Sequence, residues 1–248
     1  MHFDYAASPV PVRDDIVEAN ERAWARLSEP GAWWTGAERI EIAAEARNAV
    51  DCERCRDSKA ALSPFSVQGE HPSSAQLLSP VAVEAVHRIV TDASRLSQGW
   101  VEKNAANGLS DGHYVELLGV VVTVLSIDEL HRGLGLPTAP LPRPQAGEPG
   151  RERPEGVRSG VAWVPMLPAS AAKAGPYADL YSGLPMAPNV IAAMSLVPDA
   201  VRQLKELQDV YYLPMEQVAN PKCDGRALGR AQVELIAGRV SALNECFY

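Results

Sequence analysis

The sequence predicts an all-α protein, and two observations lead to this prediction. Apolar residues recur at the three- and four-residue spacing of helices, whereas the strict alternation typical of strands is nearly absent. Ser, Pro and Gly stand at positions where helices begin and end. The chain of 248 residues is long enough to bury roughly three quarters of its unfolded surface, so disulfide bonds are not needed for stability. We therefore expect a helical bundle.

The N-terminal half contains most of the helical pattern. Apolar faces predict helices over residues 40–50, 81–96 and 111–133. Ser79 as the N-cap and Pro80 as the first helical residue mark the start of the second of these helices. The third is expected to end at Gly133 or Gly135, because glycine commonly terminates helices.

Proline-rich segments interrupt this pattern twice. Pro9 and Pro11 keep the residues before them out of the α region, so the stretch around them is expected to be extended. Six prolines lie between Pro137 and Gly160, interspersed with glycine and charged residues. We interpret 137–160 as a linker or wrapping arm that joins an N-terminal half, residues 1–136, to a C-terminal half, residues 161–248.

The C-terminal half repeats the helical pattern. Helices are expected over Asn189 to Ser195, from Pro198 to Tyr211, and from Arg226 to Leu243.

An internal repeat of the helical core is suggested by two similar segments, residues 39–44 and 232–237. Glu41 stands eleven residues before Cys52, and Glu234 stands twelve before Cys246. A continuous helix would separate each pair by roughly 17 Å, too far for proton transfer. We therefore expect each helix to break. Asp51 and Asn244 are suitable N-caps for a new helix that holds the cysteine in its first turn.

Cys52 and Cys55 form a Cys-x-x-Cys pair, the only close spacing among the four cysteines. The N-terminus of a helix favours a thiolate and lowers a cysteine pKa, and thiols three residues apart can close a disulfide. This pattern favours redox chemistry. The alternatives are unreactive buried thiols, or a zinc site. Zinc would require a second ligand pair, and Cys223 and Cys246 are widely spaced without a nearby histidine, so neither a metal nor another cofactor is expected.

A glutamate, about a dozen residues and then Cys-x-x-Cys in an all-α chain resembles the alkylhydroperoxidase D-like and carboxymuconolactone decarboxylase family. The segments 86–92, 114–128 and 234–248 also look like its double-length, peroxidase-related members. The resemblance covers most of the chain outside the N-terminal arm and the linker. It implies a bundle of the alkylhydroperoxidase D-like type that assembles into symmetric oligomers.

The resemblance also implies roles for individual residues. Cys55 would attack a hydroperoxide, Cys52 would resolve the sulfenate as a disulfide, and Glu41 would be the carboxylate of the proton relay, with Glu45 a rival for that place. Two family histidines are replaced, one by Lys59 and one by Arg54.

Other histidines could substitute for the missing ones. His87 and, after it, His131 are the candidates, although helical histidines are more often packing residues. His2, His71 and His113 are interpreted as terminus and loop residues. In the second half, Glu234 and Cys246 fit the pattern, but the sequence ends one residue before the expected second cysteine, so this motif is incomplete.

Charge and hydropathy exclude two classes of partner. Acidic residues outnumber basic ones by 31 to 23, and no basic stripe is present, which argues against nucleic-acid binding. The longest apolar run, residues 117–127, is too short to cross a membrane. The first residues lack the pattern of a secretory signal, so a cytoplasmic location is expected.

These observations lead to one main hypothesis and two alternatives. The main hypothesis is a thiol oxidoreductase that reduces hydroperoxides through a Cys52–Cys55 dithiol/disulfide cycle, using a dithiol reductant and forming a homo-oligomer. The first alternative is a non-redox lyase of the decarboxylase branch, in which the cysteines are dispensable. The second is a catalytically inactive oligomeric member of the family.

Overall fold

The computed structural model describes residues 3–173, 175–182, 187–218, 220–222 and 227–246. Over these ranges the protein contains helices and no strand, apart from one isolated bridge between Arg158 and Met166. The helices are α1 (Asp14–Leu27), α2 (Gly36–Val50), α3 (Glu53–Ala60), α4 (Pro80–Asp92), α5 (Gln98–Ala106), α6 (Asp111–Gly133), α7 (Ala169–Lys173), α8 (Asn189–Met194), α9 (Pro198–Tyr211), α10 (Met215–Val218) and α11 (Arg230–Leu243). The prediction of an all-α protein is confirmed.

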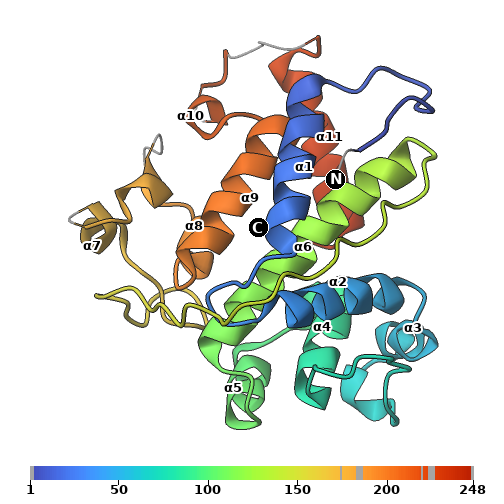
Figure 1. Ribbon diagram of the computed structural model, residues 1–248, viewed down its shortest axis with the longest axis vertical. Coiled ribbons are helices and arrows are strands. Elements are labelled where there is room, and N and C mark those ends of the chain that lie inside the picture. The colour runs from blue at the N-terminus through green and yellow to red at the C-terminus, as the bar shows by residue number, and fades with distance from the viewer. Residues whose placement is uncertain (1–2, 174, 183–186, 219, 223–226, 247–248) are drawn as a thin grey trace.

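Helix α6 lies at the centre of the fold. It packs against α2 and α4 on one side and against α9 on the other, and α9 in turn packs against α1 (Figure 1). Leu117, Val121, Val124 and Ile127 of α6 are completely buried, which explains why its sequence is apolar around most of its circumference. One core cluster therefore contains residues from both sides of the proline-rich segment.

Local capping explains where the helices of the site begin. The Ser79 hydroxyl accepts a hydrogen bond from the Ala82 amide at the start of α4, as the sequence predicts, and Pro80 is the first helical residue. Thr35 and Glu38 form a capping box at the start of α2, so this helix begins earlier than the predicted residue 40.

The expected break between Glu41 and Cys52 is present, with a shift of one residue. Helix α2 ends at Val50, and Asp51 is its C-cap, whereas Cys52 itself is the N-cap of α3. The corresponding expectation for the second half is wrong. Asn244 is the C-cap of α11, and no helix begins there within the described residues, which end at Cys246.

The segment 137–160 lies along the N-terminal half as an irregular arm. The Trp24 indole donates a hydrogen bond to the Pro140 carbonyl, and the Gln145 amide donates to the Ser28 carbonyl. Farther along, the Gly150 amide donates to the Gly31 carbonyl. These bonds satisfy polar groups of a segment that has no helix of its own.

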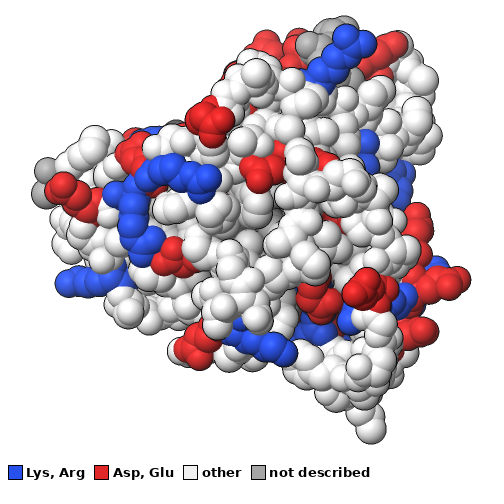
Figure 2. Space-filling model, turned by 60° about the horizontal axis from the view of Figure 1, so that its bottom comes forward, with Lys and Arg blue, Asp and Glu red and all other residues white. Residues whose placement is uncertain are grey.

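No helix in the described part of the chain is long and apolar enough to cross a membrane. Lys and Arg side chains are interspersed with Asp and Glu side chains over the face of the molecule shown in Figure 2.

Candidate active site

The two cysteines lie at the beginning of α3, where this helix packs against α4. Cys52 and Cys55 are each 3% exposed. Three further elements supply the surrounding groups: α2 provides Glu45, α4 provides His87, and the loop between α3 and α4 provides His71. Residues far apart in the sequence thus meet at one buried point.

Cys55, His87 and Glu45 form a continuous chain of polar contacts. The Cys55 Sγ lies 3.1 Å from His87 Nδ1, and His87 Nε2 lies 2.7 Å from Glu45 Oε1. A carboxylate only accepts hydrogen bonds, so the proton of the neutral ring belongs on Nε2. The lone pair of Nδ1 therefore faces the Cys55 thiol. In this arrangement Cys55 can act as a nucleophile, His87 as its base, and the Glu45 carboxylate as the group that orients the base.

Glu45 is held by three donors. In addition to His87, the Asn48 amide donates to Oε1 at 2.9 Å and the Ser73 hydroxyl donates to Oε2 at 2.8 Å. Burial alone would raise the pKa of Glu45, but these hydrogen bonds outweigh it and hold the pKa below its usual range. The carboxylate behind His87 is therefore charged at neutral pH.

His71 lies against both thiols and against His87. Its Nδ1 is 3.4 Å from Cys52 Sγ and 3.6 Å from Cys55 Sγ, and its ring stacks on that of His87 with centroids 3.8 Å apart. Its Nε2 is 2.8 Å from Glu84 Oε2. His71 thus has a carboxylate behind it, as His87 does.

Glu84 also binds a cation from α3. Arg54 Nη1 lies 3.0 Å from Glu84 Oε2 and 2.5 Å from His71 Nε2. Burial would raise the pKa of Glu84, but His71 and Arg54 together lower it to about 2. Arg54 thus holds the carboxylate that contacts His71.

The protonation states of the central pair follow from burial. Burial raises the pKa of Cys55 to about 12, so the resting group is a neutral thiol and the expected lowered pKa at the helix N-terminus is not found for Cys55. Burial also lowers the pKa of His87, against the opposing effect of Glu45. A neutral imidazole beside a neutral thiol can act as a general base.

A cavity of about 820 Å³ gives access to both cysteines. Its apolar lining includes Val90 of α4, Leu125 of α6, and Val240 and Leu243 of α11. Arg56, Lys59, Glu129 and Arg132 add charged groups to this lining. The cavity is large enough for a small organic substrate with an apolar part.

Glu41 lies away from the thiols. Its carboxylate accepts hydrogen bonds from the Gln76 amide at 3.1 Å and the Leu77 amide at 2.7 Å, so it anchors the end of the loop that carries His71. Glu45, one helical turn later on α2, occupies the place beside His87 that the resemblance gave first to Glu41.

The candidate residues of the second half do not come together. Glu234 accepts hydrogen bonds from Tyr212 and Arg230, and Cys246 is exposed. Cys223 lies outside the described residues. His131 contacts the Tyr5 hydroxyl and the Pro137 carbonyl, in a structural role beneath the N-terminal arm.

Sequence reasoning missed His71 and Glu84. No local pattern marks His71, because it stands in a loop 16 residues after Cys55. Glu84 does carry a signal, since it precedes His87 by three residues on α4 and so faces the same side of that helix.

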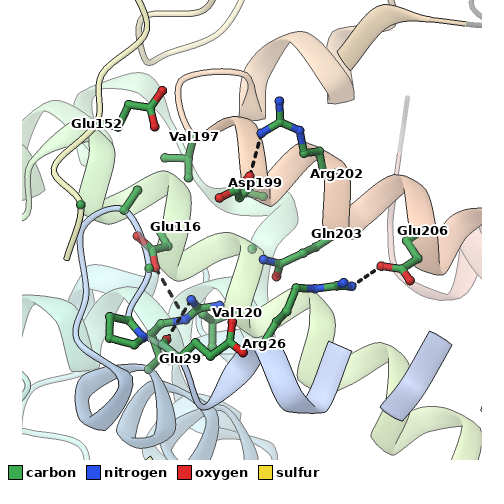
Figure 3. Close-up of a pocket in the computed structure, with 17 residues that line it drawn as sticks. Arg26, Glu29, Glu116, Val120, Glu152, Val197, Asp199, Arg202, Gln203 and Glu206 are labelled. Atoms are coloured by element: carbon green, nitrogen blue, oxygen red, sulfur yellow. Dashed lines mark hydrogen bonds and ion pairs between the residues drawn. The ribbon is translucent and has the colours of Figure 1, made fainter. Parts of the chain in front are cut away.

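A second cavity, of about 350 Å³, lies between α1, α6 and α9 (Figure 3). Six of its charged groups form ion pairs with one another: Arg26 with Glu206, Arg202 with Asp199, and the buried Arg39 with Glu116. The 17 residues that line it include no thiol, hydroxyl or imidazole group. We therefore regard the cysteine pocket as the candidate active site.

Comparisons of the chain with protein-family models, with curated proteins and with solved structures find no match.

Proposed function

We propose that the protein is a thiol peroxidase that reduces hydroperoxides through Cys55 and Cys52. The contact between Cys55 Sγ and His87 Nδ1, 3.1 Å long and backed by Glu45, carries this proposal. It supplies the nucleophile and the base that the chemistry requires. His87 would thus replace the histidines that the resemblance leads one to expect at positions 54 and 59, where this chain has arginine and lysine.

In the first step, His87 Nδ1 takes the proton of the Cys55 thiol as the sulfur attacks the terminal oxygen of the hydroperoxide. An S–O bond forms and the O–O bond breaks. The imidazolium returns its proton to the departing alkoxide, which leaves as an alcohol, and Cys55 becomes a sulfenic acid. Glu45 stabilises the imidazolium that exists between the two proton transfers.

In the second step, Cys52 resolves the sulfenic acid. Its sulfur attacks Cys55 Sγ, a disulfide forms, and the hydroxyl group leaves as water with the proton of the Cys52 thiol. His71 Nδ1, 3.4 Å from Cys52 Sγ, is the base available for this step. An external dithiol then reduces the disulfide by thiol exchange and is itself oxidised.

The surroundings of the two cysteines support this order. Both cysteines line the apolar cavity, and Cys55 lies beside both imidazoles. Cys52 contacts His71 and also lines a separate polar pocket with Asn48 and Glu70. This agrees with the roles that the family resemblance implies.

Assembly of identical copies is part of the same proposal. Helix α11 exposes Leu235, Ile236 and Leu243, whose relative accessibilities are 75%, 54% and 62%. Apolar side chains this exposed are commonly covered by a symmetry mate. Light scattering on the purified chain measures the assembly, and a monomer would contradict this part.

The experiment measures peroxide consumption with a dithiol reductant after the protein has been treated with a chelator. Cys55→Ser is expected to abolish turnover. Cys52→Ser is expected to stop after one oxidation, leaving a sulfenic acid at Cys55 that a dimedone trap detects by mass. Cys246→Ser, which removes an exposed thiol, is the matched control and should retain full activity.

Two outcomes would overturn the proposal. Absence of turnover in the unmodified protein would refute the proposed peroxidase activity and favour a non-catalytic oligomer. Activity on a lactone that survives Cys55→Ser would instead favour the non-redox lyase.

A further inference from the structure

Four potential metal ligands converge at the cysteine pocket. The Sγ atoms of Cys52 and Cys55 and one ring nitrogen each of His71 and His87 all lie within 4.8 Å of one another. The ring nitrogens that face the sulfurs are both Nδ1. The second ligand pair consists of these two histidines, which lie 16 and 32 residues after Cys55 and so are not marked by short spacing in the sequence.

The distances agree with those of a tetrahedral zinc site. Zinc lies about 2.3 Å from a cysteine sulfur and about 2.0–2.1 Å from a histidine nitrogen, so tetrahedral angles place sulfur and nitrogen roughly 3.5 Å apart. The sulfur–nitrogen distances here are 3.4 and 3.6 Å from His71, and 3.1 Å from His87 to Cys55. An ion could enter with small rotations of the four side chains.

The groups behind the ligands support the same interpretation. A metal-binding histidine usually donates its other ring N–H to a carboxylate, which fixes the tautomer and orients the ring. His87 Nε2 contacts Glu45 at 2.7 Å, and His71 Nε2 contacts Glu84 at 2.8 Å. His87 therefore directs Nδ1 toward Cys55 with its lone pair available. His71 Nδ1 also faces the sulfurs, and its lone pair is available in the tautomer that donates Nε2–H to Glu84.

We propose that Cys52, Cys55, His71 and His87 form a binding site for one Zn²⁺ ion when the cysteines are reduced. The two thiolates neutralise the charge of the ion, and Glu45 and Glu84 hold the histidines in place. Zinc binding does not require peroxide, and it competes with peroxide turnover for the same two sulfurs.

Zinc and the Cys52–Cys55 disulfide exclude one another, because each requires both sulfurs. Reaction of the zinc-bound pair with a hydroperoxide consumes two protons and yields the disulfide, an alcohol, water and free Zn²⁺. The sulfurs are oxidised and the peroxide is reduced, so no further reagent is required. Oxidation of the pair would thus release the zinc ion.

The test is a zinc titration of the whole chain, reduced with a phosphine and freed of metal by a chelator, against a chromophoric zinc indicator. One equivalent of zinc per chain is expected to bind. Co²⁺ in place of zinc should give the d–d bands of a tetrahedral ion together with thiolate-to-cobalt charge-transfer absorption. The disulfide form should bind neither ion.

Variants separate this site from adventitious binding. Cys52→Ser and His71→Ala should each abolish stoichiometric binding, and Glu84→Gln should weaken it by roughly 10- to 100-fold, as is typical for a carboxylate behind a ligand. Cys246→Ser should bind as the unmodified chain does. Circular dichroism tests whether each variant is folded. If a variant that lacks a ligand does not fold, Glu84→Gln, which keeps all four ligands, still tests the site.

Absence of binding by the reduced chain would overturn the proposal, as would binding that survives Cys52→Ser and His71→Ala or is lost in Cys246→Ser. None of these measurements uses peroxide, and the peroxidase assay contains a chelator. Failure of zinc binding and failure of the peroxidase reaction are therefore distinguished.

Discussion

Replacing Glu45 with glutamine removes the negative charge behind His87 and leaves the shape of the side chain almost unchanged. The glutamine oxygen can still accept from His87 and Asn48, and its amino group can donate to the Ser73 hydroxyl, which is able to accept. The substitution therefore tests the charge of residue 45 and not its packing.

The size of the effect follows from the ion pair that forms during proton transfer. An imidazolium and a carboxylate whose charge centres are about 4 Å apart attract one another by about 4 kcal/mol at an effective dielectric constant near 20. If half of the charge has developed in the transition state, the loss is about 2 kcal/mol, or roughly a 30-fold slower oxidation of Cys55.

The assay is single-turnover oxidation of the reduced, metal-free protein by excess hydroperoxide. The loss of free thiol at Cys55 is measured over time and gives the rate. Glu41→Gln is the matched control, because it changes a carboxylate one turn away on the same helix. The Glu41 side chain contacts only backbone amides of the loop, and a glutamine oxygen can accept from them. Its rate should stay close to that of the unmodified protein.

Two results would refute the reasoning. An unchanged rate in Glu45→Gln would show that no imidazolium forms in the rate-limiting step. If Glu41→Gln slowed the oxidation of Cys55 more than Glu45→Gln did, Glu41 would be the carboxylate of the proton relay, as the resemblance implies.

Three further predictions concern the scaffold. A Cβ atom on Gly36 would lie 2.3 Å from the Ser28 carbonyl oxygen and 2.7 Å from the Gln145 carbonyl oxygen of the 137–160 arm. Gly36→Ala should therefore lower the free energy of unfolding in urea by about 1–3 kcal/mol, and an unchanged midpoint would contradict this packing of the arm. A Cβ atom on Gly99 in α5 would meet open space, and alanine favours a helix more than glycine does. Gly99→Ala should therefore raise the free energy of unfolding by about 0.5–1 kcal/mol. The Arg153 hydrogen bond holds the pKa of Asp111 below its usual value, so this carboxylate stabilises the fold at neutral pH and the contribution is lost as the pH falls through that lowered pKa. The stability difference between Arg153→Met and the unmodified protein should therefore be largest near neutral pH and vanish in acid, and a difference independent of pH would exclude the pair as its cause.

Helix starts were predictable where a short sequence decides them. Ser79 and Pro80 define the beginning of α4 without help from the rest of the chain. Helix α1 was missed, although Ala19, Ala23 and Leu27 recur at helical spacing and are buried. The end of α11 was misjudged because Asn244 is equally suited to cap the end of one helix or the start of another, and only tertiary context decides between them.

The site was predictable to the extent that its residues are close in the sequence. Cys52 and Cys55 stand out as a pair, whereas His87 was one of two candidate histidines, together with His131. The choice between Glu41 and Glu45 depended on which side of α2 faces α4, and spacing alone does not determine that orientation. His71 was beyond reach, because its position depends on how the loop is held by Glu41 and closed against Glu84.

The same geometry supports the peroxidase chemistry and the zinc site because both require the lone pairs of two imidazoles to face the two sulfurs. What separates them is the number of sulfurs that each needs at once. Attack on a peroxide needs only Cys55, whereas a metal ion or a disulfide needs Cys52 as well. Cys52→Ser should therefore still form a sulfenic acid at Cys55 while it loses zinc. A variant that loses both, although folded, would mean that Cys52 is needed to position Cys55 and that the two functions do not divide between the two sulfurs.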